Sequence, residues 1–233
     1  MKNSKILLRL VAASLALTGI TANAQTLVLS WDLTNANAAT INPMYSTTTN
    51  QPAYSTNGYL SIGSGVTASN VSPAFRAVGF DQTSLSNALI NNDYLAFTIE
   101  PLQALAFEQV TFVVKTATSA TFNYSLFSSA SGFAEANSLF SANNGSSTAL
   151  QTNTVNLSSF PSMTNVSSSL EFRVYGYRSA AGNTAFEFAN GGSALDVGIY
   201  ATAVPEPSTV ALLALALGSL AFAGRKKIAA FRK

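Results

Sequence analysis

Residues 170–175 read Leu-Glu-Phe-Arg-Val-Tyr, and this stretch decides the fold because apolar and polar residues alternate along it. An alternation with a period of two puts the two residue sets on opposite faces of a β-strand. The inward set is Leu170, Phe172 and Val174, and the outward set is Glu171, Arg173 and Tyr175. A strand with one apolar face covers a core, so the segment predicts a sheet that packs against a second layer.

Segments of the same character recur on both sides of this strand, separated by residues that favour turns. The expected strands are 27–33, 59–62, 74–80, 94–99, 110–115, 122–127, 151–157, 170–175, 184–188 and 195–200, with a shorter segment around 138–140. Helical periodicity is confined to a turn or two around 84–90. Many short strands at regular spacing predict an all-β chain with a single β-sandwich of jelly-roll type.

The alternation also predicts which side chains point into the sandwich. Glu187 and Asp196 alternate with apolar residues and are expected on an outer face. Residues 35–59 form a long polar passage that is expected to be irregular, and 143–145 (Asn-Asn-Gly) are expected to make a tight turn. The expected core residues are Leu27, Leu29, Trp31, Val110, Phe112, Val114, Phe122, Tyr124, Leu126, Phe186, Phe188, Leu195, Val197 and Ile199.

The last thirty residues, 204–233, differ in composition from the rest of the chain. A Pro-Glu-Pro triplet at 205–207 cannot continue a helix, since proline lacks an amide hydrogen and disfavours helical geometry in the residue before it. An uncharged apolar run over 210–223 follows and ends against three consecutive cations at 225–227. A short apolar helix with a basic end is typical of a segment that enters a membrane and stops there.

This tail resembles the PEP-CTERM sorting signal of exopolysaccharide-producing Gram-negative bacteria. The resemblance implies that an exosortase, a membrane-embedded cysteine transpeptidase, recognises and removes the tail, which holds the chain in the membrane until then. It implies a role for each part of the tail: the sorting motif is Pro205, Glu206 and Pro207, the membrane stop is Arg225, Lys226 and Lys227, and the transmembrane helix spans 208–224. Residues 228–233 extend beyond the basic cluster, where many members of the family end.

The N-terminal residues predict a secretory signal peptide. Residues 1–9 carry three cations, 10–20 are apolar, and Ala-Asn-Ala at 22–24 fits the small-x-small cleavage pattern. Cleavage between Ala24 and Gln25 is therefore expected. The resulting division is a signal peptide at 1–24, a β-sandwich domain at 25–203 and a sorting signal at 204–233.

The predicted domain is acidic although the whole chain has a formal net charge of +2. Eight of the twelve cations lie in the two targeting segments, which leaves four cations against nine acids and a net charge of −5 over residues 25–203. A basic surface is the electrostatic footprint of nucleic-acid binding. A nucleic-acid partner is therefore not expected.

The residue types narrow the catalytic chemistry. The chain has no histidine and no cysteine, which excludes cysteine nucleophiles and serine–histidine–aspartate triads, and it has no glycine-rich phosphate loop. We expect no cofactor and no metal site, and a calcium ion at Asp32 or Asp196 would be structural. Carboxylate-pair glycoside hydrolysis stays open, since Glu171, Glu187 and Asp196 could share a sheet face. Simple cross-strand ion pairs with Arg173 are the favoured interpretation.

Sugar binding is the other open function. Carbohydrate-binding jelly rolls stack a sugar ring on an exposed aromatic side chain, and the same side chains also serve to cover a sheet face. The candidate glycan contacts are Tyr175, Tyr177, Tyr200, Glu171 and Arg173. The layout of the strands also resembles the jelly-roll cargo often found upstream of this sorting tail. We therefore expect an exported, non-catalytic protein with a structural or adhesive role in an extracellular polysaccharide layer, and a carbohydrate-binding module is the alternative.

Overall fold

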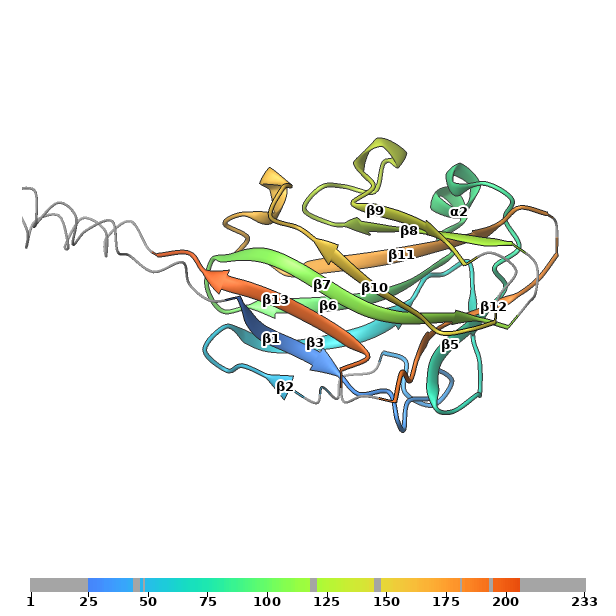
Figure 1. Cartoon of the computed structure of the whole chain (residues 1–233), viewed down its shortest axis with the longest axis horizontal. Helices are drawn as coiled ribbons and strands as arrows, with labels where there is room; N and C mark the ends of the chain where they lie inside the picture. The colour runs from blue at the N-terminus through green and yellow to red at the C-terminus, as the bar shows by residue number, and fades with distance from the viewer. Residues whose placement is uncertain are drawn as a thin grey trace, which may run out of the picture.

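The computed structural model describes residues 25–43, 47, 49–117, 121–144, 148–180, 182–192 and 195–205, and these fold into two antiparallel sheets packed face to face (Figure 1). The predicted all-β sandwich is confirmed. The signal peptide, the transmembrane helix and the membrane stop lie outside the described residues, as do Ala24, Glu206 and Pro207 of the predicted site residues.

Within the described residues, the larger sheet, sheet A, has eight strands. They are β1 (Thr26–Trp31), β2 (Thr49–Asn50), β4 (Thr67–Ala68), β5 (Ala74–Val78), β7 (Leu105–Thr116), β10 (Gln151–Asn156), β12 (Ala185–Ala189) and β13 (Val197–Ala203). The order is β2-β1-β13-β7-β12-β5-β4, with β10 paired to β7. Because Phe112 pairs with both Val197 and Asn153, and Val114 with both Phe188 and Gln151, β12 and β13 share one edge of β7 and β10 takes the other.

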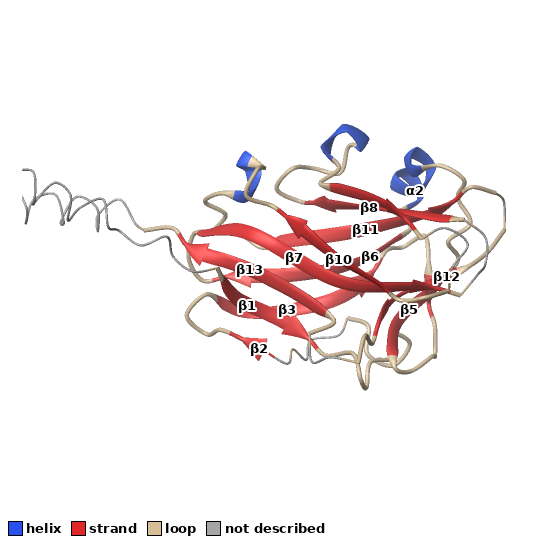
Figure 2. Ribbon diagram, viewed as in Figure 1, coloured by secondary structure: helices blue, strands red, loops and turns tan. Residues whose placement is uncertain are grey.

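Sheet B has five strands within the described residues, in the order β3-β6-β11-β8-β9 (Figure 2). They are β3 (Ser55–Ile62), β6 (Tyr94–Pro101), β11 (Leu170–Arg178), β8 (Phe122–Ser128) and β9 (Phe140–Asn143). The central strand β11 contains the alternating stretch 170–175. The inward residues Leu170, Phe172 and Val174 are fully buried, as predicted.

A connected cluster of aromatic rings fills the space between the sheets. Phe97 of β6 stacks on Phe172 with ring centroids 5.0 Å apart and meets Trp31, Phe112 and Phe188 of sheet A at centroid distances of 5.8–6.5 Å. The rings join the two sheets directly, and Trp31 is a core residue as predicted. Since the chain has no cysteine, this packing has no disulfide to assist it.

Helix α2 (Leu85–Asn91) covers part of the outer face of sheet B, where it contacts β11. Its N-cap is Ser84, whose hydroxyl accepts a hydrogen bond from the Asn87 amide, and its C-cap is Asn92 in the left-handed conformation. Two short 3-10 helices, η1 (Glu135–Asn137) and η2 (Pro161–Met163), lie in the loops after β8 and β10. The predicted helix at 84–90 is confirmed.

Four details differ from the sequence-based expectations, and one of them is that Leu195, expected in the core, is only half-buried. A bulge between Leu27 and Leu29 brings Val28 into the core and leaves Leu27 only half-buried, because an extra residue shifts the alternation. Asp196, expected outside, is fully buried and precedes β13. The passage 35–59 contains β2 and the start of β3. The tight turn expected at 143–145 lies partly outside the described residues.

Candidate functional site

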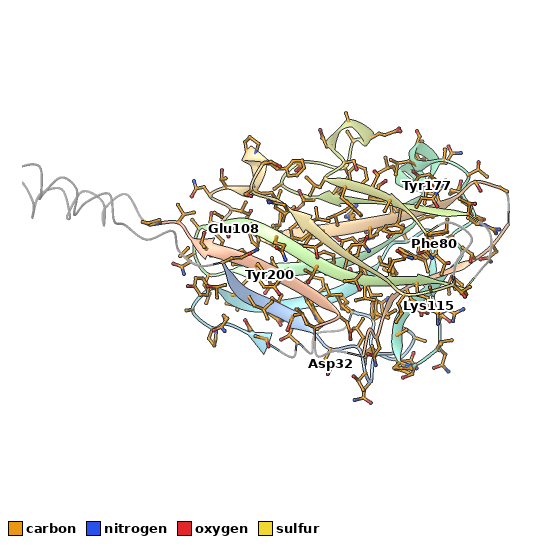
Figure 3. All side chains as sticks on the ribbon, viewed as in Figure 1. Asp32, Phe80, Glu108, Lys115, Tyr177 and Tyr200 are labelled. Carbon is orange, nitrogen blue, oxygen red and sulfur yellow. The ribbon has the colours of Figure 1, made fainter. Side chains whose placement is uncertain are left out.

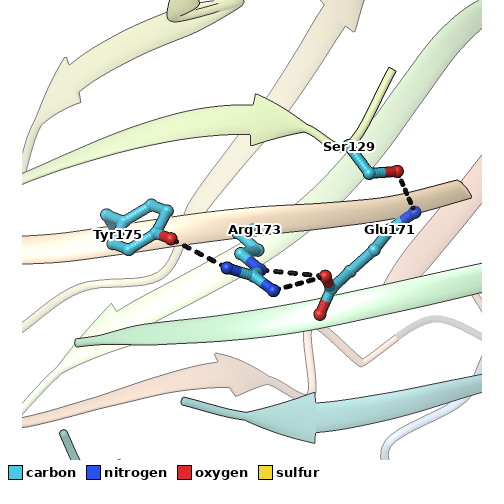
Figure 4. Close-up of polar contacts among 4 residues, drawn as sticks. All are labelled: Ser129, Glu171, Arg173 and Tyr175. Atoms are coloured by element: carbon cyan, nitrogen blue, oxygen red, sulfur yellow. Dashed lines mark hydrogen bonds and ion pairs between the residues drawn. The ribbon is translucent and has the colours of Figure 1, made fainter. Parts of the chain in front are cut away.

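Three of the four predicted glycan contacts on β11, namely Glu171, Arg173 and Tyr175, form a hydrogen-bonded row on the outer face of sheet B (Figure 4). The Arg173 guanidinium donates from Nε to Glu171 Oε2 at 2.9 Å, and its Nη2 lies 2.8 Å from the same oxygen. Nη1 of Arg173 donates to the Tyr175 hydroxyl at 3.2 Å. An ion pair with Arg173 was expected across strands, but Glu171 and Arg173 lie two residues apart on the same strand, β11, and of the three acids considered only Glu171 pairs with this arginine.

The same arginine is held between two aromatic rings. Its guanidinium carbon lies 4.4 Å from the ring centroid of Tyr94 and 3.9 Å from that of Phe133. The two cation–π contacts and the Glu171 carboxylate together hold the guanidinium in place. These contacts tie β6, β11 and the loop after β8 to one another.

Tyr175 points outward as predicted, yet its ring is only 1% exposed. It packs with Ala88 of helix α2 and with Phe127, and burial raises the pKa of its hydroxyl. A ring buried beneath a helix has no face left for a sugar, so Tyr175 is not available as a stacking platform. Tyr177 is half-buried against the same cluster.

The remaining predicted contact, Tyr200, lies on β13 of sheet A and is half-buried. Figure 3 shows Tyr200 and Tyr177 on different sheets, toward opposite ends of the sandwich. The five predicted glycan contacts therefore do not form one site. The sequence gives their outward direction but not the sheet to which each strand belongs.

The Arg173 row is expected to stabilise the domain. Replacing Arg173 with alanine removes the ion pair and both ring contacts, and it leaves the Tyr175 hydroxyl without its donor. We expect a loss of about 2 kcal/mol in the free energy of unfolding, measured by urea denaturation. Arg173→Lys keeps the positive charge but loses the planar guanidinium that donates to two partners and stacks on the rings. It should therefore restore less than half of the stability lost in Arg173→Ala. Wild-type stability in Arg173→Ala would contradict the structural role.

The three acids considered for glycoside hydrolysis do not share a face. Glu171 lies on sheet B, whereas Glu187 lies on β12 and Asp196 beside β13 in sheet A. The buried Asp196 carboxylate accepts the backbone amides of Leu33 at 2.8 Å and Gly191 at 2.7 Å. These bonds pin two loops to the sheet and give the carboxylate a structural role. Burial raises its pKa, and the two amides oppose that shift.

Calcium binding at Asp32 or Asp196 finds no support in the described residues. Asp32 accepts the backbone amide and the hydroxyl of Thr34, which hold its pKa below the usual range. No group of three potential acidic, histidine or cysteine ligands occurs in the part of the chain that the structure describes. The carboxylates of both residues already accept hydrogen bonds from protein donors.

A groove of about 430 Å³ lies over the outer face of sheet A, and of its lining residues only Glu187 was considered as a site residue from the sequence. Its floor is formed by outward side chains of three neighbouring strands, and the floor residues are Ala74 and Arg76 of β5, Glu187 and Ala189 of β12, and Lys115 of β7. Its walls come from the loops around these strands, and the wall residues are Val71, Ser72, Pro73, Leu150, Asn190 and Gly192.

Three charges cross the groove floor in one row. Glu187 pairs with Arg76 on one side and with Lys115 on the other in the strand register. Arg76 Nη1 lies 3.8 Å from Glu187 Oε2, so the pair is an ion pair without a hydrogen bond. Burial raises the pKa of Glu187, and the two cations oppose that shift. Cross-strand pairing was expected for Glu187, but its partner is Arg76 because β12 lies next to β5.

Residues 203–227 match the family described as the PEP-CTERM protein-sorting motif. The chain carries a PEP-CTERM sorting signal. This signal marks an exported protein that is anchored in the membrane transiently before it reaches the cell surface or the exterior. Within the described residues no helix has the length and apolar character needed to cross a membrane. The segment predicted to do so, 208–224, lies outside them.

No curated protein matches the chain. Similar solved structures include a variant of a carbohydrate-binding module of family 29 (11% identity, 76% of this chain and 92% of that chain, TM-score 0.37). Another is the module TmCBM61 in complex with β-1,4-galactotriose (10%, 72% and 99%, 0.33). A third is the K1 cleaved adhesin domain of Lys-gingipain from Porphyromonas gingivalis (14%, 64% and 84%, 0.31). Similarities at this level establish neither a shared ligand nor a shared role.

Proposed function

We propose that this PEP-CTERM protein delivers a non-catalytic β-sandwich to the extracellular polymer layer, where the sandwich has a structural or adhesive role. The observation that carries the proposal is the sorting motif at 203–227, which begins at the last residue of β13. The Val204 amide still donates to the Ala104 carbonyl at 2.9 Å, so the sandwich continues to the edge of the signal. The folded domain is therefore the cargo.

A non-catalytic role agrees with how the acids of the domain are used. Glu171 is engaged by Arg173, Glu187 lies between two cations, and Asp196 accepts two backbone amides. Glycosidases need two carboxyl groups about 5–10 Å apart across a cleft. Glu171 lies on sheet B, apart from Glu187 and Asp196 of sheet A, and each of the three carboxylates already has partners within the protein, which supports a non-catalytic role.

Intact mass of the protein from cells and from medium tests the delivery. We expect the mature species to begin at Gln25 and to end near residues 205–207, because the two targeting segments are removed. Replacing Glu206 with alanine should leave the chain uncleaved and in the membrane fraction. As a matched control, Glu108→Ala changes an acid of the sandwich and should be processed normally. A wild-type chain that keeps residues 210–233 would refute removal by an exosortase.

Carbohydrate binding is the second candidate function, and the groove on sheet A favours it. The groove lies on a sheet face, is open to solvent beside the exposed Leu150, and offers charged, amide and hydroxyl groups. Under this second proposal the protein binds the extracellular polysaccharide in which it is located. Under this proposal the predicted contacts on β11 stabilise the fold, and the ligand is bound elsewhere.

A further inference from the structure

The groove concentrates positive charge that the rest of the domain lacks. Residues 25–203 contain only four cations against nine acids, and two of the four, Arg76 and Lys115, line the groove. Arg173 is held between two rings on sheet B, and Arg178 is buried with 8% exposed. The groove floor, with one acid and two cations, therefore carries a net charge of +1 on a domain whose net charge is −5.

From this arrangement we propose that the groove binds the carboxylate of an acidic polysaccharide through Arg76 and Lys115. The inference rests on the proposed delivery to a polymer layer and names the class of polymer. A net charge of +1 balances one carboxylate per sugar unit, whereas a phosphate monoester carries about −1.5 to −2 at neutral pH. The site therefore suits a uronic-acid unit better than a phosphorylated one.

Both cations have hydrogen-bond donors to offer. Arg76 meets Glu187 at 3.8 Å, so this ion pair leaves the Nη1 donor without a hydrogen bond to that carboxylate. The Lys115 ammonium has no hydrogen bond or ion pair to another described residue. Charge-assisted hydrogen bonds from such groups to a carboxylate are about twice as strong as neutral ones. Glu187 balances one of these two positive charges, and the second is left for an external anion.

The uncharged lining supports a saccharide over an acidic peptide. Ala74 and Ala189 pair in the strand register, and their small side chains carry no charge into the groove floor. Ser72 and Asn190 provide a hydroxyl and an amide at the wall, the groups that sugar hydroxyls bond to. Val71 and Leu150, 38% and 47% exposed, offer apolar contact for the carbon face of a ring.

Isothermal titration of the full chain in non-ionic detergent with polygalacturonate tests the proposal. Fully methyl-esterified polygalacturonate is the matched ligand, since esterification removes the charge and keeps the sugar backbone. We expect binding of the acid form only, and binding that weakens between 0.05 and 1 M salt, where the Debye length falls to about 3 Å. Lys115→Gln should weaken binding about tenfold, since it removes one charged partner of the carboxylate.

Asn87→Asp is the matched control variant. It lowers the net charge by one, as Lys115→Gln does, but places the change on helix α2 over sheet B. It should bind polygalacturonate like the wild type, which separates a local contact from a general charge effect.

Equal binding of the esterified polymer, or wild-type affinity in Lys115→Gln, would overturn the proposal. If the protein bound polyglutamate as tightly as polygalacturonate, the groove would recognise carboxylates in general, and the proposed preference for a saccharide would be wrong. Delivery to the polymer layer is judged separately, by intact mass.

Discussion

Phe97→Ala is expected to lower the free energy of unfolding by about 4 kcal/mol, the range found when a buried aromatic ring is deleted from a core. Phe97 is fully buried and meets rings from both sheets, with Phe172 on its own sheet and Trp31, Phe112 and Phe188 on the other. Its loss leaves a cavity between the layers. Because a domain of this size has a total stability of about 5–15 kcal/mol, the variant should unfold at a far lower urea concentration.

Ile90→Ala is the control for this substitution. Ile90 lies on helix α2 with 74% of its surface exposed, so its deletion should change the free energy of unfolding by no more than about 0.5 kcal/mol. Urea unfolding of both variants, followed by tryptophan fluorescence, measures the difference; Trp31 is the single reporter. A Phe97→Ala midpoint within error of that of Ile90→Ala would mean that the rings do not hold the sheets together.

Asp93→Asn is expected to stabilise the domain by about 3 kcal/mol at pH 8. Asp93 follows the C-cap of helix α2, is 1% exposed, and has one carboxylate oxygen, Oδ2, without a hydrogen-bond partner among the described residues. Burial, with a smaller effect of the charge on Asp81, raises the pKa of Asp93 from 3.8 to about 7. One pKa unit corresponds to about 1.4 kcal/mol, so ionisation of the folded carboxyl costs about 4 kcal/mol.

The direction of the pH effect follows from proton binding. Between pH 4 and pH 7 the folded carboxyl keeps its proton while the unfolded one has released it, so stability from this group falls as pH rises through that window. The wild type and Asp93→Asn should therefore be similar in stability near pH 4 and differ most at pH 8. Urea unfolding at both values measures this.

Glu135→Gln provides the comparison for Asp93→Asn, since Glu135 is an exposed acid in η1. It should change stability by less than about 0.5 kcal/mol at either pH. If Asp93→Asn differed from the wild type by the same amount at pH 4 and pH 8, ionisation of Asp93 would not be the cause.

Local features of the fold follow from short patterns that depend on neighbours in sequence. The alternation over 170–175 correctly gives the two faces of β11, and Ser84 correctly marks the start of helix α2. Trp31 is correctly a core residue, since it shares the alternation of Leu29. Each of these depends on periodicity or capping, which act within one element.

Contacts between distant segments are where prediction from the sequence fails. Asp196 was expected outside because it alternates with Val197, yet loops carrying Leu33 and Gly191 fold over it and donate to its carboxylate. Tyr175 points outward correctly but is covered by Ala88 of helix α2. Nothing in the local pattern of either residue records which loop or helix lies above it.

The groove was missed for the same reason. Arg76, Lys115 and Glu187 are far apart in sequence, and each resembles an ordinary solvent-facing charge in its own strand. The strand order brings them into one row, since β12 lies between β5 and β7. The sequence does contain one signal for the groove, namely that residues 25–203 have only four cations. Because cations are so scarce, two of them side by side on the surface indicate a candidate anion-binding site.

The length of β7 determines how the molecule faces its surroundings. At one end Leu105 pairs with Ala203, where the chain leaves the sandwich, and at the other Lys115 pairs with Glu187 in the groove. Ten residues of strand separate these positions, or about 33 Å. A molecule tethered at its C-terminus therefore holds the groove at the end of the sandwich that lies far from the tether. We therefore expect the groove to bind in the same way before and after the sorting signal is removed.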